Sequence, residues 1–243
     1  MPASLAKLFV IDYANEIADL NEIVHASPHA LSTTKPGSST AGITEQEYYL
    51  HNLFAAILVP SGNNAAYVVA DYCGGILAPD ASTSEKRVTA FMHGLQEHLT
   101  GIVCSDTVLY DPSEFDLEAR TTVLDLKIVA DRLLEKDWFR DTICQSRYTA
   151  TLPDGSTQTW KNTNTFLDPD SEYYNENVLG IKTGFLSDDY ILIVLYRQYN
   201  KEFLICSLGS AATSSRYEDV SVILKTMDES NYLSGSGNGT SDK

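Results

Sequence analysis

The sequence predicts a mixed α/β fold of the α+β type, in which an antiparallel sheet packs against a helical region. Three strand-like runs, residues 178–185, 190–198 and 202–208, follow one another near the C-terminal end, and short turns separate them. Strands joined in this way form an antiparallel meander. Most of the preceding chain has apolar residues at helical intervals instead. Helices that precede a run of strands indicate this fold class.

The first helix is expected over residues 4–20, directly after Pro2, because proline suits the start of a helix. Residues 25–42 are rich in Ser, Thr, Pro and Gly and predict an exposed loop. A helical pattern returns over residues 45–58. The N-terminal part of the chain is therefore expected to be helical except for this one loop.

A tight connection between two helices is predicted at residues 60–63. Pro60 and Gly62 interrupt the helical pattern, and a new one starts at Asn64 and stops near Gly74. Later in the chain we expect helices over residues 83–99, 122–136 and 216–231, and a hairpin of residues 148–152 and 156–161 around Pro153, Asp154 and Gly155.

The length of 243 residues suits one large domain, which we place at residues 1–233, with a disordered tail at 234–243. The net charge of -16 would repel a phosphate backbone, so nucleic acid is not an expected partner. The longest apolar run, residues 190–196, is much shorter than the roughly 20 residues of a transmembrane helix. We expect no transmembrane segment, and no secretory signal peptide opens this chain.

Metal sites and cofactors are not expected. His25 and His29 lie beside Pro28 in the predicted loop, and metal ligands need a rigid element and further partners. The cysteines follow no C-x-x-C spacing, which argues against a zinc site or a redox dithiol. We expect them to be buried free thiols: Cys73, Cys104, Cys144 and Cys206.

Ser4 and Lys7 are the candidate nucleophile and base. They stand three residues apart on a predicted helix, so their side chains share one face. A serine hydroxyl is a weak nucleophile until a base takes its proton, and a lysine can be that base only if burial or nearby positive charge lowers its pKa. Lys182 is the candidate for that charge.

The Ser-x-x-Lys spacing alone is a weak signal, because about one match is expected by chance in a chain of this length. Ser32 and Lys35 form a second match. Pro36 follows them directly and denies that segment a helix. Only the match at Ser4 has the helix that fixes its geometry.

Two further motifs accompany this pair. Ser61, Gly62 and Asn63 lie in the predicted inter-helix connection, whereas the same triplet at residues 236–238 lies in the predicted tail. Residues 182–184, Lys-Thr-Gly, are more specific, with roughly one chance occurrence in twenty such chains. They lie on a predicted strand, where a substrate peptide can pair with the backbone.

A Ser-x-x-Lys helix, a Ser-Gly-Asn loop and a Lys-Thr-Gly strand, in this order, are typical of penicillin-binding proteins and β-lactamases. The chain resembles the low-molecular-mass penicillin-binding proteins of the D-alanyl-D-alanine carboxypeptidase family, which have a β-lactamase-like fold. The matching segments are residues 2–7, 60–66 and 180–185.

The resemblance implies a serine-type D-Ala-D-Ala carboxypeptidase that trims peptidoglycan stem peptides. Ser4 would be acylated by the penultimate D-alanine, the last D-alanine would leave, and water would free the enzyme. Lys7 would be the base and Ser61 a proton relay to the leaving amine. Asn63 would hold the substrate amide and orient Lys7, and Lys182 would add positive charge.

The resemblance also implies how the substrate is bound. The peptide would lie along Thr183 and Gly184, and the backbone N–H groups of Ser4 and Phe185 would stabilise the oxyanion. Arg216 would grip the terminal carboxylate, a group that a guanidinium binds with two hydrogen bonds. β-Lactam antibiotics would be covalent ligands, and the protein would work outside the cytoplasmic membrane.

The chain departs from the family pattern in three places. The family has a helix and two strands before its nucleophile, whereas three residues precede Ser4, so we expect two of five strands to be missing from the sheet of this chain. Leu186 replaces a small or hydroxylated residue, and residues 111–114 replace an Asn-Pro-containing loop.

Two other functions are compatible with the same motifs. A non-catalytic penicillin-binding sensor domain would keep the fold without turnover, because fold does not fix function. A β-lactamase would have to hydrolyse its acyl-enzyme quickly, and class A enzymes use a glutamate for that step. No glutamate of this chain stands in a recognisable context for it.

Overall fold

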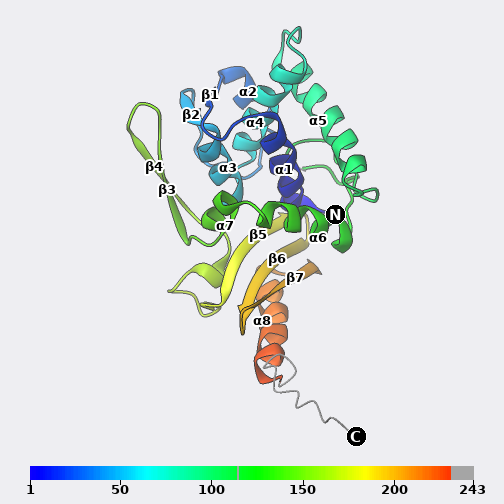
Figure 1. The fold of residues 1–243 in the computed structure, drawn as a ribbon, viewed down its shortest axis with the longest axis vertical. Coiled ribbons are helices and arrows are strands. Elements are labelled where there is room, and N and C mark those ends of the chain that lie inside the picture. Colours follow the sequence, from blue (N-terminus) through cyan, green and yellow to red (C-terminus); the bar gives the residue numbers. More distant parts are fainter. Residues whose placement is uncertain (114, 231–243) are drawn as a thin grey trace, which may run out of the picture.

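A computed structural model describes residues 1–113 and 115–230 of the protein. Helices α1 to α7 gather on one side of a three-stranded sheet, and the last helix covers its other side (Figure 1). The predicted α+β class is confirmed. The helices of the first group are α1 Lys7–Ile17, α2 Pro28–Ser32, α3 Leu50–Leu58, α4 Asn63–Leu77, α5 Ser84–Gly101, α6 Val123–Leu134 and α7 Asp137–Ile143.

The sheet consists of β5 Val178–Leu186, β6 Asp189–Gln198 and β7 Lys201–Ser210, antiparallel in this order. The helix on its far side is α8 Thr213–Glu229. Strand β6 is central and contributes to two hydrophobic cores, which explains its uninterrupted apolar run. Ile191, Ile193 and Leu195 belong to the core of the helical region, and Leu192, Val194 and Tyr196 belong to the core against α8.

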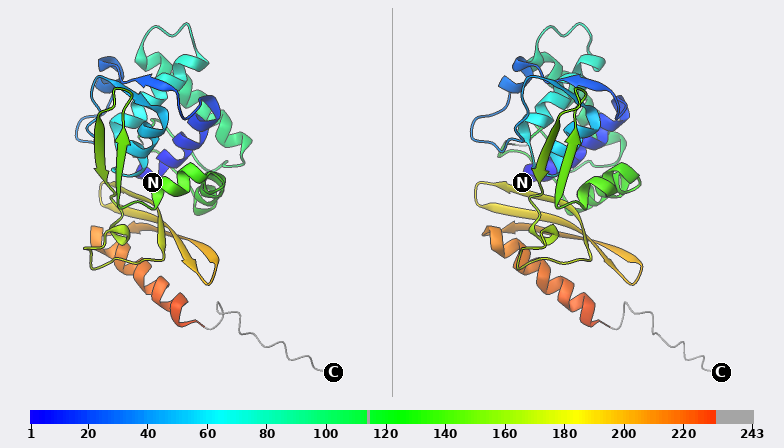
Figure 2. Two further views of the ribbon diagram at one scale, coloured as in Figure 1. Left: turned by 60° about the vertical axis from the view of Figure 1, so that its left-hand side comes forward. Right: turned by 90° about the vertical axis from the view of Figure 1, so that its left-hand side faces the viewer.

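Both predicted hairpins are present. In the turn from β6 to β7, Tyr199 and Asn200 have φ of 49° and 61°, the left-handed conformation that two-residue hairpin turns favour. Strands β3 Arg147–Thr151 and β4 Thr157–Lys161 form the second hairpin. This hairpin stands at the edge of the helical region, away from the three-stranded sheet (Figure 2).

The predicted starts of α5 and α6 are correct to within one residue, because a threonine caps each helix. The Thr83 hydroxyl accepts a hydrogen bond from the Lys86 backbone N–H, and the Thr122 hydroxyl accepts one from the Asp125 N–H. A capping hydroxyl satisfies one of the free N–H groups of the first turn. These helices therefore begin where their sequence signals lie.

The predictions for residues 25–58 are partly wrong. The segment expected to be a loop contains α2, which Ser27 caps by accepting a hydrogen bond from the Ala30 N–H at 3.1 Å. The helix expected from residue 45 starts only at Leu50, because residues 47–49 form strand β2 and pair with β1 Ile23–His25. Helix α7 was not predicted.

The cysteines were expected to be buried free thiols, and only two of them are buried. All of them are free, but only Cys73 and Cys104 are buried. Cys206 is half-buried, and Cys144, which follows the last residue of α7, is exposed. The reason is that Cys144 ends a short helix at the surface.

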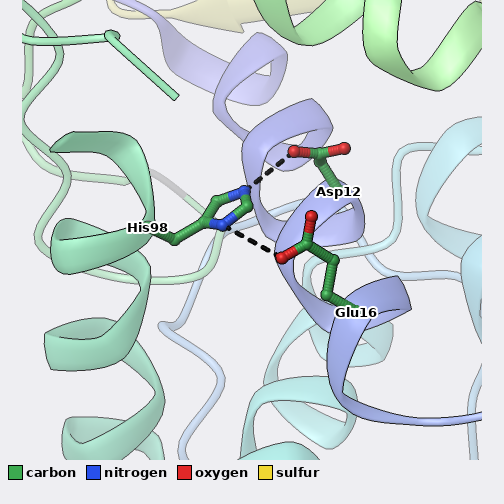
Figure 3. Close-up of side chains that lie close together, drawn as sticks. All are labelled: Asp12, Glu16 and His98. Carbon is green, nitrogen blue, oxygen red and sulfur yellow. Dashed lines mark hydrogen bonds and ion pairs between the residues drawn. The ribbon is translucent and has the colours of Figure 1, made fainter. Parts of the chain in front are cut away.

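Helix α1 is fixed to two neighbouring helices by an ionic network around the buried Asp12 carboxylate. His98 of α5 lies between two carboxylates of α1, with Nε2 2.9 Å from Asp12 and Nδ1 3.4 Å from Glu16 (Figure 3). Arg132 of α6 pairs with both carboxylates. These side chains are of the type that binds metals, but here Arg132 is the cation that balances the acids.

The domain boundaries stay a prediction, and the predicted tail at 234–243 lies outside the described residues. In the described part of the chain, no helix combines the length and the apolar character that crossing a bilayer requires.

Candidate active site

Ser4 and Lys7 lie together at the junction of a short 3-10 helix, Ala3–Ala6, and α1. The Lys7 side chain is fully buried, and its Nζ donates to the Ser4 Oγ at 3.0 Å. The two side chains are therefore in contact, as their spacing in the sequence predicts.

The Lys7 Nζ also contacts the inter-helix connection that precedes α4. It lies 2.9 Å from the Ser61 carbonyl oxygen, 3.2 Å from the Ser61 Oγ and 2.5 Å from the Asn63 Oδ1. Lysine can only donate when charged, so this cage of oxygens holds its nitrogen in one place. Ser4, Ser61 and Asn63, which were all predicted to be catalytic, thus surround the Lys7 nitrogen.

Burial lowers the pKa of Lys7 from 10.5 to about 7, and the nearby Asp111 carboxylate opposes this shift. An ammonium taken out of water loses its hydration, which favours the neutral amine. Near neutral pH a large fraction of Lys7 is thus neutral. A neutral amine beside a serine hydroxyl is able to accept its proton.

The connection at residues 60–63 is held in one strained conformation. Ser61 has a φ of 64°, which is uncommon for a residue with a side chain and typical of functional sites. Gly62 has no room for a side chain, because a Cβ there would lie 2.5 Å from the Ala41 Cβ. The Asn63 N–H donates to the Ser39 carbonyl at 2.8 Å.

Strand β5 brings Lys182 and Gly184 to the same centre. Burial, together with the charges of Lys7 and Arg216, lowers the pKa of the buried Lys182. Its Nζ donates to the Thr183 carbonyl at 2.9 Å. A Cβ on Gly184 would lie 3.2 Å from the Ser4 backbone nitrogen, so the missing side chain admits a close approach of strand and nucleophile.

Two predicted substrate-binding side chains are engaged with the protein itself. The Thr183 hydroxyl shares a hydrogen bond of 2.7 Å with Thr163. Arg216 is buried, and its guanidinium donates to the Gly184 and Ile191 carbonyls at 2.9 and 3.3 Å. The Arg216 Nε has no hydrogen-bond partner among the described residues. A contact of Arg216 with a substrate carboxylate stays a prediction.

A cleft of about 470 Å³ opens beside Ser4. Of the predicted site residues, Ser4, Asn63 and Phe185 line it, whereas Lys7, Ser61 and Lys182 are buried. The other lining residues come from three segments: Gly37, Ser38 and Ser39; Ser113, Phe115 and Leu117; and Leu186 and Ser187.

The sequence singled out residues 111–114 only as a departure from the family pattern, and it did not identify residues 111–113 and 115–117 as a wall of the site. Asp111 organises it by accepting hydrogen bonds from the Ser113 N–H and hydroxyl at 2.9 and 2.7 Å. Lys35 pairs with Asp111 at 2.7 Å and so ties this wall to the segment that carries Ser38. Ser32 is the last residue of α2, and Lys35 lies beyond the end of that helix, where it has this structural role.

The fold is shared with solved DD-peptidases and penicillin-binding proteins. The DD-transpeptidase of Streptomyces K15 is 24% identical with a TM-score of 0.80, and the match covers 92% of this chain and 86% of that one. Penicillin-binding protein D2 of Listeria monocytogenes, solved in an ampicillin-bound form, is 19% identical with a TM-score of 0.69, covering 92% and 85%. These likenesses define the protein as one with a DD-peptidase fold.

The family model for D-alanyl-D-alanine carboxypeptidases matches residues 1–200. The chain therefore belongs to this family of serine peptidases. A comparison with curated protein sequences gives no match.

Proposed function

We propose that the protein is a serine-type D-Ala-D-Ala carboxypeptidase, which removes the terminal D-alanine of peptidoglycan stem peptides through an acyl-enzyme on Ser4. The observation that carries this proposal is the 3.0 Å contact between the Ser4 Oγ and the Nζ of a buried lysine whose pKa is lowered to about 7. A serine with an adjacent neutral base is an activated nucleophile.

In the acylation step, the Ser4 oxygen attacks the carbonyl carbon of the penultimate D-alanine while its proton passes to Lys7. The C–N bond then breaks. The leaving amine takes a proton that Lys7 returns through the Ser61 hydroxyl, which lies 3.2 Å from Nζ. The backbone N–H groups of Ser4 and Phe185 are the proposed donors to the oxyanion.

Hydrolysis of the ester completes the cycle. A water molecule gives its proton to Lys7 and its hydroxide adds to the ester carbonyl. Ser4 then leaves and recovers its proton. The products are the shortened stem peptide and the free enzyme, so no metal or cofactor is required for either half of the reaction.

The buried Arg216 guanidinium suits a substrate that ends in a carboxylate. Lys182 and Arg216 lie close enough for their charges to interact. The Asp111 carboxylate is paired with Lys35, so its negative charge is compensated within the protein. We propose that Arg216, which has an unpartnered Nε, contributes to binding of the terminal carboxylate.

We further propose that β-lactams acylate Ser4 by opening of their ring. This is supported by the family membership of the chain and by the ampicillin-bound form of the Listeria protein. Because peptidoglycan lies outside the cytoplasmic membrane, we propose that the protein works there.

The test is intact mass after incubation with benzylpenicillin, followed over time, beside a Ser4→Ala variant. A lasting adduct on the parent protein alone, together with release of D-alanine from a D-Ala-D-Ala peptide, is the expected result. An adduct without D-alanine release would identify a sensor domain, and rapid loss of the adduct would identify a β-lactamase. Absence of any adduct on Ser4 would overturn the acyl-enzyme mechanism.

A further inference from the structure

The β3–β4 hairpin is bonded to residues 41–43, although none of the hairpin's own residues, all of which the structure describes, lines the active-site cleft. The Trp160 Nε1–H of β4 donates to the Ala41 carbonyl at 2.7 Å. The Gln158 side-chain amide donates to the same carbonyl at 3.0 Å and to the Gly42 carbonyl at 3.1 Å. Two donors from one strand thus occupy both lone pairs of the Ala41 oxygen.

Helix α4 holds the same segment from its other side. The Asn64 Oδ1 accepts a hydrogen bond from the Ala41 N–H at 2.9 Å, and the Asn64 amide donates to the Ile43 carbonyl at 3.4 Å. All three of these residues are buried. Residues 41–43 are therefore fixed between β4 and the first turn of α4, in an interior too dense for them to shift freely.

Ala41 in turn supports the connection that carries Ser61 and Asn63. A Cβ on Gly62 would lie 2.5 Å from the Ala41 Cβ, so the two backbones are in direct contact. The connection supplies three of the oxygens around the Lys7 Nζ. Ser61 has the strained φ of 64°, and such a conformation persists only where the surrounding structure holds it.

We infer that strand β4 is a positioning element of the active site. Trp160 and Gln158 are positioning residues that act through Ala41 and touch no reacting atom. By fixing Ala41, they keep the oxygens around Lys7 in place. This inference rests on the proposed function, since the cage around Lys7 affects a rate only if Ser4 is acylated. Misplacing a reacting group by about 1 Å slows a reaction substantially, even when the change lies far from the chemistry.

The first test removes one hydrogen-bond donor and keeps an aromatic ring. Trp160→Phe should slow acylation of Ser4 by benzylpenicillin roughly tenfold, measured where urea unfolding shows the variant to be folded. The midpoint of its pH profile should move up, because water that reaches a loosened Lys7 restores hydration that burial removes. Asp111 and Lys182, the charged groups that act on Lys7, are unchanged. A loss of stability alone moves neither the rate of folded protein nor the midpoint.

Trp138→Phe is the matched control. The Trp138 ring packs on Phe54 within the helical region, with ring centroids 5.4 Å apart, and its replacement should leave the rate and the midpoint unchanged. A second pair exchanges glutamine for methionine. Gln158→Met should slow acylation about threefold, since the Trp160 hydrogen bond remains. Gln96→Met, which removes a hydrogen bond of 3.3 Å to the Thr107 carbonyl, should not slow it.

Parent rates and midpoints in both Trp160→Phe and Gln158→Met would overturn the inference and leave the proposed function standing. Equal slowing in Trp138→Phe would overturn it as well, because the effect would then be a general one. Should Trp160→Phe fail to fold, Gln158→Met and its control decide. Failure of the parent protein to form any adduct on Ser4 would overturn both the proposed function and the inference.

Discussion

In the proposed mechanism, Lys7 is the base. It must be uncharged to accept the Ser4 proton, and burial lowers its pKa to about 7. Protonated Lys7 has no lone pair for the Ser4 proton, so acylation is expected to fail as pH falls below that value. In this mechanism, the protonation state of the Lys7 side chain is expected to set the rate of acylation.

We therefore expect the rate of Ser4 acylation by benzylpenicillin to rise with pH, with an apparent midpoint near pH 7, and then to level off. Rapid-quench mass spectrometry between about pH 5.5 and about pH 9 measures this profile. Because Lys182 is buried close by, the midpoint belongs to the coupled pair. A rate that does not change with pH, or a midpoint near that of an ordinary lysine, contradicts the role of Lys7.

Asp111 is the carboxylate that raises the pKa of Lys7 against the effect of burial. Replacing it by Asn removes that charge, so the pKa of Lys7 should fall further and the midpoint of the profile should move to lower pH. Lys35→Met is the matched control, since it breaks the same ion pair and keeps the carboxylate. A midpoint that moves down in both variants would show that loop order, not the Asp111 charge, is responsible.

The sequence identified the centre of the site but not its walls. Ser4 and Lys7 share a helical face, and this local geometry follows directly from their spacing. The contribution of Phe115 and Leu117 depends on the Lys35–Asp111 pair, which joins two distant loops. No local pattern encodes such a contact, so the sequence could not predict it.

At the level of elements, two glycines allow the backbone segments of the site to approach one another. Gly184 brings β5 to the Ser4 nitrogen, and Gly62 lets the connection before α4 pack on Ala41 and the Ala56 carbonyl. A side chain at either position would move an element that carries a residue of the proposed catalytic site. Such packing changes are costly because interiors are dense.

Gly62→Ala should lower the free energy of unfolding by about 1–3 kcal/mol and slow acylation of Ser4. The added Cβ would lie 2.5 Å from the Ala41 Cβ and 3.0 Å from the Ala56 oxygen. Gly101→Ala, at the end of α5, meets nothing within 4 Å and should not destabilise the protein. Urea unfolding and penicillin acylation measure the two effects. Equal stabilities of both variants would contradict this account.

Elements were predicted well where their signals are local. Thr83 and Thr122 cap their helices, and the apolar run of β6 is long enough to identify a strand. The boundary between β2 and α3 was missed because β2 exists only through its pairing with β1. Strand pairing over such a separation is a tertiary effect that overrides helical periodicity.

At the scale of the whole molecule, α1 is the common support of the site and of the helical region. Its N-terminal end carries Lys7, and its later turns carry Asp12 and Glu16, which bind His98 and Arg132. This network, of which Figure 3 draws Asp12, Glu16 and His98, thus fixes the orientation of the helix that carries Lys7.

Arg132→Met should lower the free energy of unfolding by about 1–3 kcal/mol, because it leaves the buried Asp12 carboxylate with incomplete compensation. The matched control is Lys127→Met on the same helix. Lys127 pairs with Asp131 at the surface, so its loss should change stability by no more than about 0.5 kcal/mol. Urea unfolding of both variants checks the difference, and a control as destabilised as Arg132→Met would contradict it.

The approach of Gly184 to the Ser4 nitrogen joins two residues that are far apart in the sequence. During synthesis Ser4 emerges well before the strand that completes its surroundings. Closing so long a loop has an entropic cost that only the rest of the folded structure can offset. The serine is therefore expected to stay unreactive in partly folded chains. The amount of penicillin label would then report the number of completely folded molecules, and not the number of chains that have been translated.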